Sequence, residues 1–214
     1  MKYHKLVENA KKPNGFWGKM MIKAMNKGHS SLTSWGLEHM NIERTATVLD
    51  IGCGGGKTVD RLCSIVANGK VYGIDYSELS VKSSEKLNSK NILCNKAKIL
   101  QASVSDMPFD DNTFDNITAV ETYYFWPDKE NDVKEVFRVL KQGGTVMLLF
   151  EMLRTDDDPF KWEKVENMLN IKSVTPQEIR AVLGSAGFEN INTYTKEGTT
   201  WLCATAQKPK DDEN

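Results

Sequence analysis

A glycine-rich segment in the first third of the chain constrains the fold more than any other feature. The apolar run Val48–Ile51 contains one acid, Asp50, and is followed by glycine at positions 52, 54 and 56. The run is typical of a buried strand, and the residues from Lys57 onward are typical of a helix. Glycine at such a junction lets the backbone turn tightly and lets a ligand lie against main-chain atoms. The helix then turns its free N–H groups and positive dipole end toward that ligand, as in the loops that bind nucleotide-like cofactors.

The spacing of the glycines distinguishes between kinds of cofactor loop. A dinucleotide-binding loop, G-x-G-x-x-G, would require glycine where the chain has Lys57. A phosphate-binding P-loop would require glycine where the chain has Ile51, although Gly56-Lys57-Thr58 matches the end of that motif. The pattern that fits is D-x-G-x-G-x-G over Asp50–Gly56. For this motif alone, a glycine-rich turn without a ligand stays open as the alternative.

With this motif the chain resembles the class I S-adenosylmethionine-dependent methyltransferases. In that family the loop holds the methionine end of the cofactor, largely through main-chain atoms, and binds no pyrophosphate. The resemblance extends over about residues 46–207, with three further segments that match in the family's order. It implies S-adenosyl-L-methionine as the cofactor and transfer of its methyl group by direct displacement.

The second matching segment, Lys70–Asp75, is typical of the next strand and ends in an acid. A carboxylate at the end of this strand can accept hydrogen bonds from the ribose hydroxyls of an adenosine. Asp75 would otherwise cap a helix that begins near Ser77, but Ser77 can provide that cap itself. The resemblance implies that Asp75 and the adjoining Tyr76 bind the cofactor.

The third matching segment, Ala102–Asp115, resembles the part of the family between the third and fourth strands. The family often has Asp where this chain has Ser103, and that Asp accepts from the adenine amino group. Ser103 can still accept one hydrogen bond, without the charge, and the backbone of Val104 is expected at the edge of the adenine ring.

The fourth matching segment, Arg138–Gly144, combines basic residues with two glycines and precedes the apolar run Thr145–Phe150. It predicts a helix end, because Lys141 would complement the negative end of the helix and Gly143 suits a C-cap. This segment supports the fold rather than the chemistry.

Helix and strand patterns alternate from residue 47 onward, which favours a parallel sheet covered on both faces. Strands are expected near residues 47–51, 70–75, 98–102, 115–121, 144–150, 188–197 and 199–207, and helices near 57–67, 77–90, 129–140, 159–170 and 175–186. Thr175–Glu178 has the residues of a capping box with proline at the first helical position. The last two strands are joined tightly at Gly198, so they should pair antiparallel. The expected fold is a Rossmann-like, doubly wound α/β sheet of seven strands, mostly parallel with a C-terminal antiparallel hairpin.

Three regions are expected along the chain. Residues 1–44 should form a helical extension that covers the site as a lid, with one or two helices over residues 16–41. Residues 45–208 should form the S-adenosylmethionine-binding domain, and residues 209–214 a disordered tail.

The acceptor is expected beyond the carboxyl ends of the strands, where open α/β sheets bind their ligands. The fourth expected strand runs into Val120–Pro127, in which Glu121 and Tyr123 are predicted to face the reactive methyl group. For the aromatic residues Phe125 and Trp126, a role in packing at a corner of the fold is as consistent with the sequence as a role beside the reactive methyl group. Glu151, at the end of the fifth expected strand, either lines the acceptor pocket or is a solvated strand end.

A histidine in the expected lid is a further candidate. His29 lies among small and hydroxyl residues between Trp17 and Trp35, and a histidine can act as a general base because its pKa lies near neutrality. A capping or packing role is the alternative. The predicted catalytic residues are His29, Glu121 and Tyr123. The predicted cofactor-binding residues are Asp50, Gly52, Cys53, Gly54, Asp75, Tyr76, Ser103, Val104 and Glu121.

The composition narrows the class of partner. The 28 basic and 29 acidic side chains give a net charge of -1, so no basic field favours nucleic acid. No run approaches the ~20 apolar residues that span a membrane, and the N-terminal residues lack an apolar core of secretory length. The four cysteines show no metal-binding spacing, so no metal site is expected and a cytoplasmic location is the simplest interpretation.

The leading hypothesis is therefore a methyltransferase that acts on a small molecule. Methylation of RNA or protein is an alternative with the same chemistry. Two alternatives of other classes stay open, a nicotinamide-dependent oxidoreductase and a module that binds the cofactor without catalysis.

Overall fold

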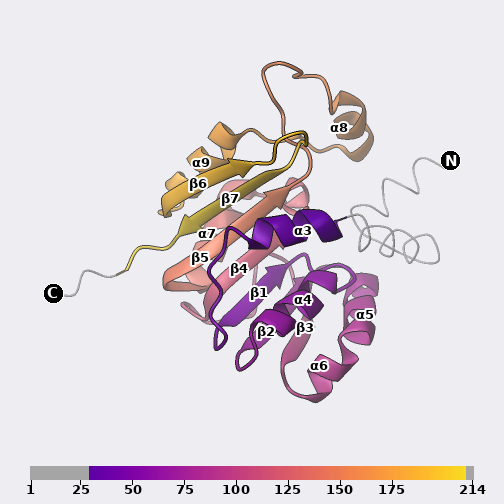
Figure 1. Ribbon diagram of the computed structural model, residues 1–214, viewed down its shortest axis with the longest axis vertical. Helices are drawn as coiled ribbons and strands as arrows, with labels where there is room; N and C mark the ends of the chain where they lie inside the picture. The colour runs from indigo at the N-terminus through magenta and orange to yellow at the C-terminus, as the bar shows by residue number, and fades with distance from the viewer. Residues whose placement is uncertain (1–28, 211–214) are drawn as a thin grey trace.

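A seven-stranded sheet forms the centre of the molecule (Figure 1). The structure is a computed structural model and describes residues 29–210 of the chain. The strands are β1 (Thr47–Ile51), β2 (Lys70–Asp75), β3 (Ala97–Gln101), β4 (Phe114–Val120), β5 (Leu140–Phe150), β6 (Glu189–Thr195) and β7 (Leu202–Gln207). Their order across the sheet is β3-β2-β1-β4-β5-β7-β6. The first five strands pair in parallel, and β7 pairs antiparallel with both β5 and β6, which confirms the predicted Rossmann-like fold.

Helices cover both faces of the sheet. The helices are α3 (Ser30–Leu37), α4 (Lys57–Ile65), α5 (Glu78–Leu87), α6 (Ser89–Leu93), α7 (Lys129–Val139), α8 (Glu163–Leu169) and α9 (Pro176–Ser185), with one 3-10 turn, η1 (Tyr123–Phe125). The helices α3 and α4 lie on one face, and α7 and α9 lie on the other (Figure 1). None of the helices within residues 29–210 is long and apolar enough to cross a membrane.

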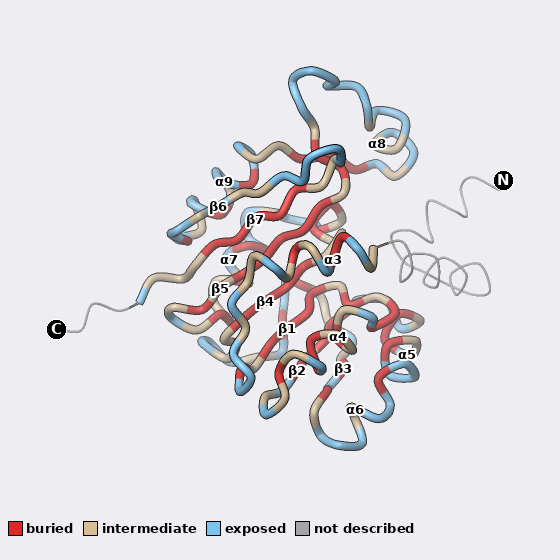
Figure 2. Tube along the Cα trace, in the orientation of Figure 1, coloured by how far each residue is buried: buried red, intermediate tan, exposed pale blue. Residues whose placement is uncertain are grey.

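The central strands are buried on both faces, as the apolar runs of the sequence predict (Figure 2). In β1, Val48 packs with the core beneath α4, whereas its neighbour Leu49 packs with the core beneath α7 and α9. This alternation follows from the strand's two-residue period. A third apolar cluster, in which Leu32 of α3 contacts Met147 and Leu149, joins α3 to β5.

Two helix starts follow the predicted capping chemistry. Thr175 caps α9 with a complete capping box, in which Glu178 bonds back to the Thr175 backbone. Ser77 caps α5 by accepting from the backbone N–H of Ser80 at 3.4 Å. Because Ser77 provides this cap, as its sequence position suggested, the carboxylate of Asp75 is not needed for it.

The predicted C-cap of the helix over 129–140 is wrong. Helix α7 ends at Val139, and β5 begins at once with Leu140, which is fully buried. Lys141 therefore lies in a strand, where its ammonium bonds to Asp115 at 2.8 Å. Gly143 has a φ of +73° within β5, at an irregularity in its pairing with β4. The burial of Leu140 explains the difference, because the core continues across the junction and no exposed turn separates the two elements.

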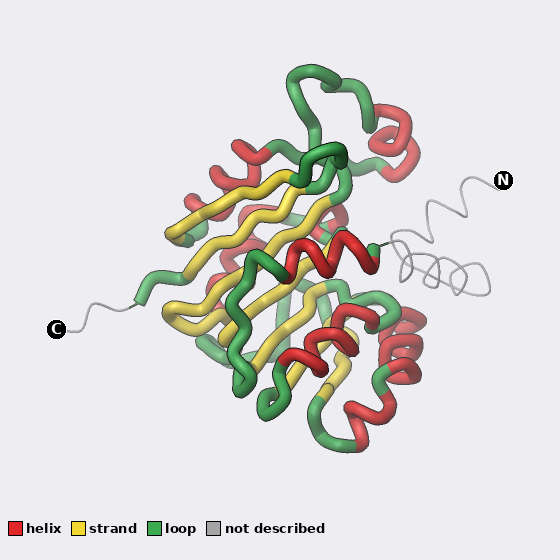
Figure 3. Tube along the Cα trace, viewed as in Figure 1, coloured by secondary structure: helices red, strands yellow, loops and turns green. Residues whose placement is uncertain are grey.

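One other expectation changes, and one is only partly covered by the described residues. The helix expected over 159–170 is the shorter α8, carried by a long loop between β5 and α9 (Figure 3). Of the expected N-terminal lid, the structure describes α3, which lies over β5. Residues 1–28, which include Trp17, lie outside the described residues.

Gly56 provides a test of the turn between β1 and α4. Its φ is +81°, and a Cβ there would lie 2.3 Å from Ser84 Oγ and 2.5 Å from Asn88 Nδ2. Gly198, in the β6–β7 turn, has a similar φ of +70° but no atom within 4 Å of such a Cβ. Both alanine variants should lose about 1–2 kcal/mol to the left-handed backbone, and Gly56→Ala should lose roughly 1–3 kcal/mol more to crowding. Chemical denaturation measures both, and equal losses would contradict the crowding at Gly56.

Candidate functional site

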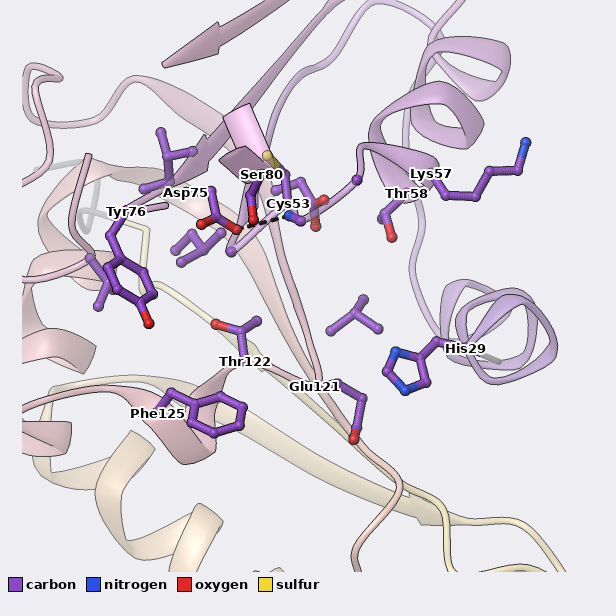
Figure 4. Close-up of a pocket in the computed structure, with 18 of the residues that line it drawn as sticks. His29, Cys53, Lys57, Thr58, Asp75, Tyr76, Ser80, Glu121, Thr122 and Phe125 are labelled. Carbon is purple, nitrogen blue, oxygen red and sulfur yellow. Dashed lines mark hydrogen bonds between the residues drawn. The ribbon is translucent and has the colours of Figure 1, made fainter. Parts of the chain in front are cut away.

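A cavity of about 400 Å³ opens at the carboxyl ends of β1, β2 and β4 (Figure 4). Strand β1 has β2 on one side and β4 on the other, so the order of the strands along the sheet reverses next to β1. Open α/β sheets bind their ligands at such a switch point. Of the predicted site residues, those that line the cavity are His29, Asp50, Gly52, Cys53, Gly54, Asp75, Tyr76, Ser103, Val104 and Glu121.

The glycine loop forms one wall of the cavity. Gly52 and Gly54 both have left-handed backbones, with φ of +68° and +52°. A Cβ on Gly52 would lie 2.6 Å from Thr122 Oγ1, so only glycine lets the loop approach the end of β4. A Cβ on Gly54 would lie no nearer than 4.0 Å to its closest neighbour, the Gly52 carbonyl oxygen, so this part of the main chain borders open space. The loop is therefore a concave stretch of main chain, and a ligand can lie directly against it.

Asp75 joins the glycine loop to the end of β2. One of its carboxylate oxygens accepts from the Gly54 N–H at 3.0 Å, and the other accepts from the Ser77 N–H at 2.8 Å. Burial raises the pKa of Asp75, and the bonds from Ser77, Gly54 and the Ser80 side chain oppose that shift (Figure 4). The side chain is thus held in one orientation beside the cavity.

Asp50 lies deeper, under the loop. It is 2% exposed and accepts from the Thr118 hydroxyl at 2.8 Å. Burial raises its pKa to about 7, with the Thr118 bond opposing the shift and the charge of Asp75 adding to it. Burial and the same two carboxylates hold the pKa of the Cys53 thiol well above its usual value, so this thiol stays neutral.

Glu121, His29 and Glu151 lie together on the other side of the cavity. Glu121 follows β4 with a φ of +59°, which is uncommon for a residue with a side chain. Burial raises the pKa of its carboxyl to about 8. The His29 imidazole points toward Glu121 (Figure 4), and its Nε2 lies 3.7 Å from the Glu151 carboxylate. Burial lowers the pKa of His29, while Glu151 acts in the opposite direction.

The structure does not bring Tyr123 to the cavity. Its side chain is 5% exposed and packs in the core against Trp126 and Phe150. The turn η1 explains this, because it directs Tyr123 inward while Thr122 and Phe125 line the cavity.

The structure bears on one further predicted contact, and it brings to the cavity residues that the sequence did not single out. The Ser103 hydroxyl accepts from the Ser105 N–H at 3.2 Å, so it already serves a local turn. Arg61 lines the cavity and bonds to the backbone of Ser30 at 2.9 Å, which ties α4 to the start of α3. Its position one helical turn after Lys57 was the signal that could have identified it.

Known proteins with similar sequences are methyltransferases. A family model described as a methyltransferase domain matches residues 49–148. The chain is 27% identical over 183 residues to the uncharacterized methyltransferase YdaC of Bacillus subtilis, a match that covers 85% of this chain and 93% of YdaC. It is 31% identical over 181 residues to the ubiquinone/menaquinone biosynthesis C-methyltransferase UbiE of Cronobacter sakazakii, covering 73% of this chain and 72% of UbiE.

The fold has close counterparts among solved structures. A chain of the complex between the Haloferax volcanii Trm112 methyltransferase activator and a methyltransferase superposes with a TM-score of 0.76 and 20% identity. The match covers 90% of this chain and 95% of that chain. At this identity the likeness shows the shared fold.

The buried Asp50 carboxyl predicts a pH dependence of stability. Its pKa is about 7 in the folded protein and 3.8 ordinarily, so the folded state binds more protons between these values. Stability should therefore fall as the pH rises from about 4 through about 7. Asp50→Asn should make this fall in the free energy of unfolding smaller, by roughly 4 kcal/mol at most. The limit follows because a tenfold difference in proton affinity corresponds to about 1.4 kcal/mol.

Urea unfolding of the wild type and of Asp50→Asn at pH 5 and pH 8 measures this effect. The exposed Asp156 provides the matched control, and Asp156→Asn should leave the pH dependence unchanged. The same fall in both the wild type and Asp50→Asn would show that Asp50 is not the group responsible.

Proposed function

The chain belongs to the class I S-adenosylmethionine-dependent methyltransferase family, and from this premise we propose that it methylates a small molecule in the cavity at the ends of β1, β2 and β4. Its cofactor is S-adenosyl-L-methionine. The observation that carries the assignment of the cofactor site is the bond between the Gly54 N–H and the Asp75 carboxylate, 3.0 Å long. That bond joins a main-chain cradle to an acid at the end of β2, within one wall of the cavity.

In this proposal the two ends of the wall bind two parts of the cofactor. The main chain of Gly52 and Gly54, with Cys53 between them, binds the methionine end. The carboxylate of Asp75 accepts from the ribose hydroxyls, and its unused lone pairs leave room for them beside the bonds from Gly54 and Ser77.

The adenine lies farther along β2 and the loop after β3. Tyr76, Ser103 and Val104 line this part of the cavity. The hydroxyl of Ser103 is engaged by Ser105, so we assign the adenine edge to the backbone of Val104 and the ring face to side chains. Asp50, at the end of the cavity beside the glycine loop, is held by the bond that its carboxyl accepts from Thr118 of β4.

The methyl group is transferred on the side of Glu121 and His29. When bound, S-adenosylmethionine supplies an electrophilic methyl group on a sulfonium, so the protein needs to align an acceptor and exclude water. Orientation of this kind can lower a barrier by roughly 7–11 kcal/mol. Burial lowers the pKa of His29, which keeps its imidazole available to take a proton from an acceptor that carries one.

A small acceptor fits the dimensions and charge of the site. The cavity volume of about 400 Å³ is in the range of small-ligand pockets, about 300–1,000 Å³. The net charge of -1 provides no general attraction for RNA. The similarity to UbiE, whose name assigns it to quinone biosynthesis, also favours a small organic acceptor.

Substitution of Asp75 tests the cofactor site. A hydrogen bond to a charged group contributes ~1.5–3 kcal/mol, so Asp75→Ala should weaken S-adenosylmethionine binding by about ten- to a hundredfold. Asp75→Asn keeps one acceptor oxygen and should lose less. Calorimetric titration measures both affinities, and circular dichroism checks that the variants fold. The matched control is Glu78→Ala, an exposed acid on α5 outside the cavity. Unchanged affinity in Asp75→Ala would exclude the ribose assignment.

The acceptor class is tested by a screen. Small thiols, amines, phenols, quinols and carboxylates are incubated with the full chain and cofactor, and release of S-adenosylhomocysteine is measured. We expect turnover with one class of small molecule and none with bulk RNA or a protein mixture. Turnover confined to RNA or protein would overturn the small-molecule assignment.

A further inference from the structure

We propose that His29, Glu121 and Glu151 form a binding site for one divalent metal ion at the acceptor side of the cavity. The role of the ion rests on the proposed function, but its binding does not. With the ion bound, the His29 imidazole would be a ligand, and the ion in place of the imidazole would lower the pKa of the acceptor. One ligand atom from each of the three side chains lies within 4.8 Å of the other two. Metal–ligand bonds of about 2.0–2.2 Å then require only small side-chain movements.

The three side chains come from separate elements that meet only in the folded chain. His29 is the N-cap of α3, Glu121 follows β4 and Glu151 follows β5. The strands β4 and β5 are parallel neighbours, so their carboxyl ends bring the two glutamates to one edge of the sheet. The packing of α3 on β5 brings the histidine there.

The charge of the cluster favours a cation. Two carboxylates face each other, and the only ion pair that either glutamate forms within residues 29–210 is the one from Glu151 to His29. A divalent ion would compensate the negative charge of both carboxylates, taking the place of a proton on Glu121. One imidazole nitrogen and two carboxylate oxygens suit first-row ions such as Mn²⁺, Fe²⁺ and Zn²⁺.

Glu121 is held as metal ligands are usually held, by a surrounding set of hydrogen bonds. The backbone N–H of Glu151 and the hydroxyl of Tyr124 both donate to its Oε1. The Tyr124 hydroxyl in turn accepts from the Met152 N–H at 3.0 Å. Both bonds use the same oxygen, which leaves Oε2 for another partner. Such outer contacts fix the orientation of a ligating carboxylate.

Three protein ligands leave further coordination positions for solvent or substrate. Because His29 and Glu121 line the cavity, these positions face the acceptor. The site would therefore select an acceptor with an oxygen donor, such as a phenol or an enol, and hold that oxygen in a fixed place. This choice narrows the small-molecule class to oxygen-bearing acceptors.

Binding of Mn²⁺ alone to the full chain tests the site. Mn²⁺ prefers oxygen and imidazole ligands, so the exposed Cys94 does not compete for it. The electron paramagnetic resonance signal of free Mn²⁺ disappears on binding, which gives affinity and stoichiometry. We expect one saturable ion per chain, weakened about tenfold or more by Glu151→Gln and by His29→Gln. Glu78→Gln, an exposed acid on α5, should bind as the wild type does.

The outcomes separate this proposal from the assignment of the cofactor site. Absence of saturable binding in the wild type, or an affinity in both ligand variants equal to that of the wild type, would overturn the metal site. The cofactor affinity of the same samples is measured by calorimetry. If Asp75→Ala loses cofactor binding but still binds Mn²⁺, the result concerns the cofactor site alone. The two ligand variants, Glu151→Gln and His29→Gln, lie on separate elements, so the test stays valid if one of them fails to fold.

Discussion

The structure depends on the tight turn that carries the chain from β1 into α4. The left-handed backbones of Gly52 and Gly56 reverse the chain between the buried strand β1 and the half-buried helix α4. The carbonyl of Gly56 accepts from the Asn88 side chain at 2.9 Å, and a Cβ on Gly56 would meet Ser84. The turn is thus packed against the end of α5 as well. A side chain at Gly56 would push the start of α4 away from the end of α5, so the loop that borders the cavity also holds these two helices together.

The cavity collects carboxyl groups that the fold buries. Burial raises the pKa of Asp50, Asp75 and Glu121, and each is held by hydrogen bonds from neighbouring strands or loops. Concentrated acidic groups destabilise a folded protein when they ionise together, unless a positive ligand or a proton compensates. A sulfonium cofactor and a divalent ion are both positive, and our two proposals put them on opposite sides of the same acidic cavity. The electrostatic cost of the site in the free protein is consistent with selection for binding rather than for stability.

Sequence and structure agree best where a local rule acts. The strand runs, the Thr175 capping box and the glycine loop each depend on neighbouring residues, and all three appear as expected. The errors occur where packing over a distance decides. The end of α7 was misplaced because the burial of Leu140 outweighed the turn chemistry of Gly143. Tyr123 was expected in the cavity because it follows a strand end, but the turn η1 directs its ring into the core.

The sequence by itself determined the order of strands and helices, the class of cofactor loop and most of the residues along one wall of the cavity. These follow from residue type and spacing, because strand ends in a parallel sheet fall on one edge. Only the tertiary structure decided which side chains meet on the opposite wall. His29 reaches Glu121 and Glu151 through the packing of α3 on β5, and no spacing in the chain encodes that contact. A metal-binding set drawn from three separate elements leaves no linear motif, since its distances are set by the packing of the sheet and not by the chain.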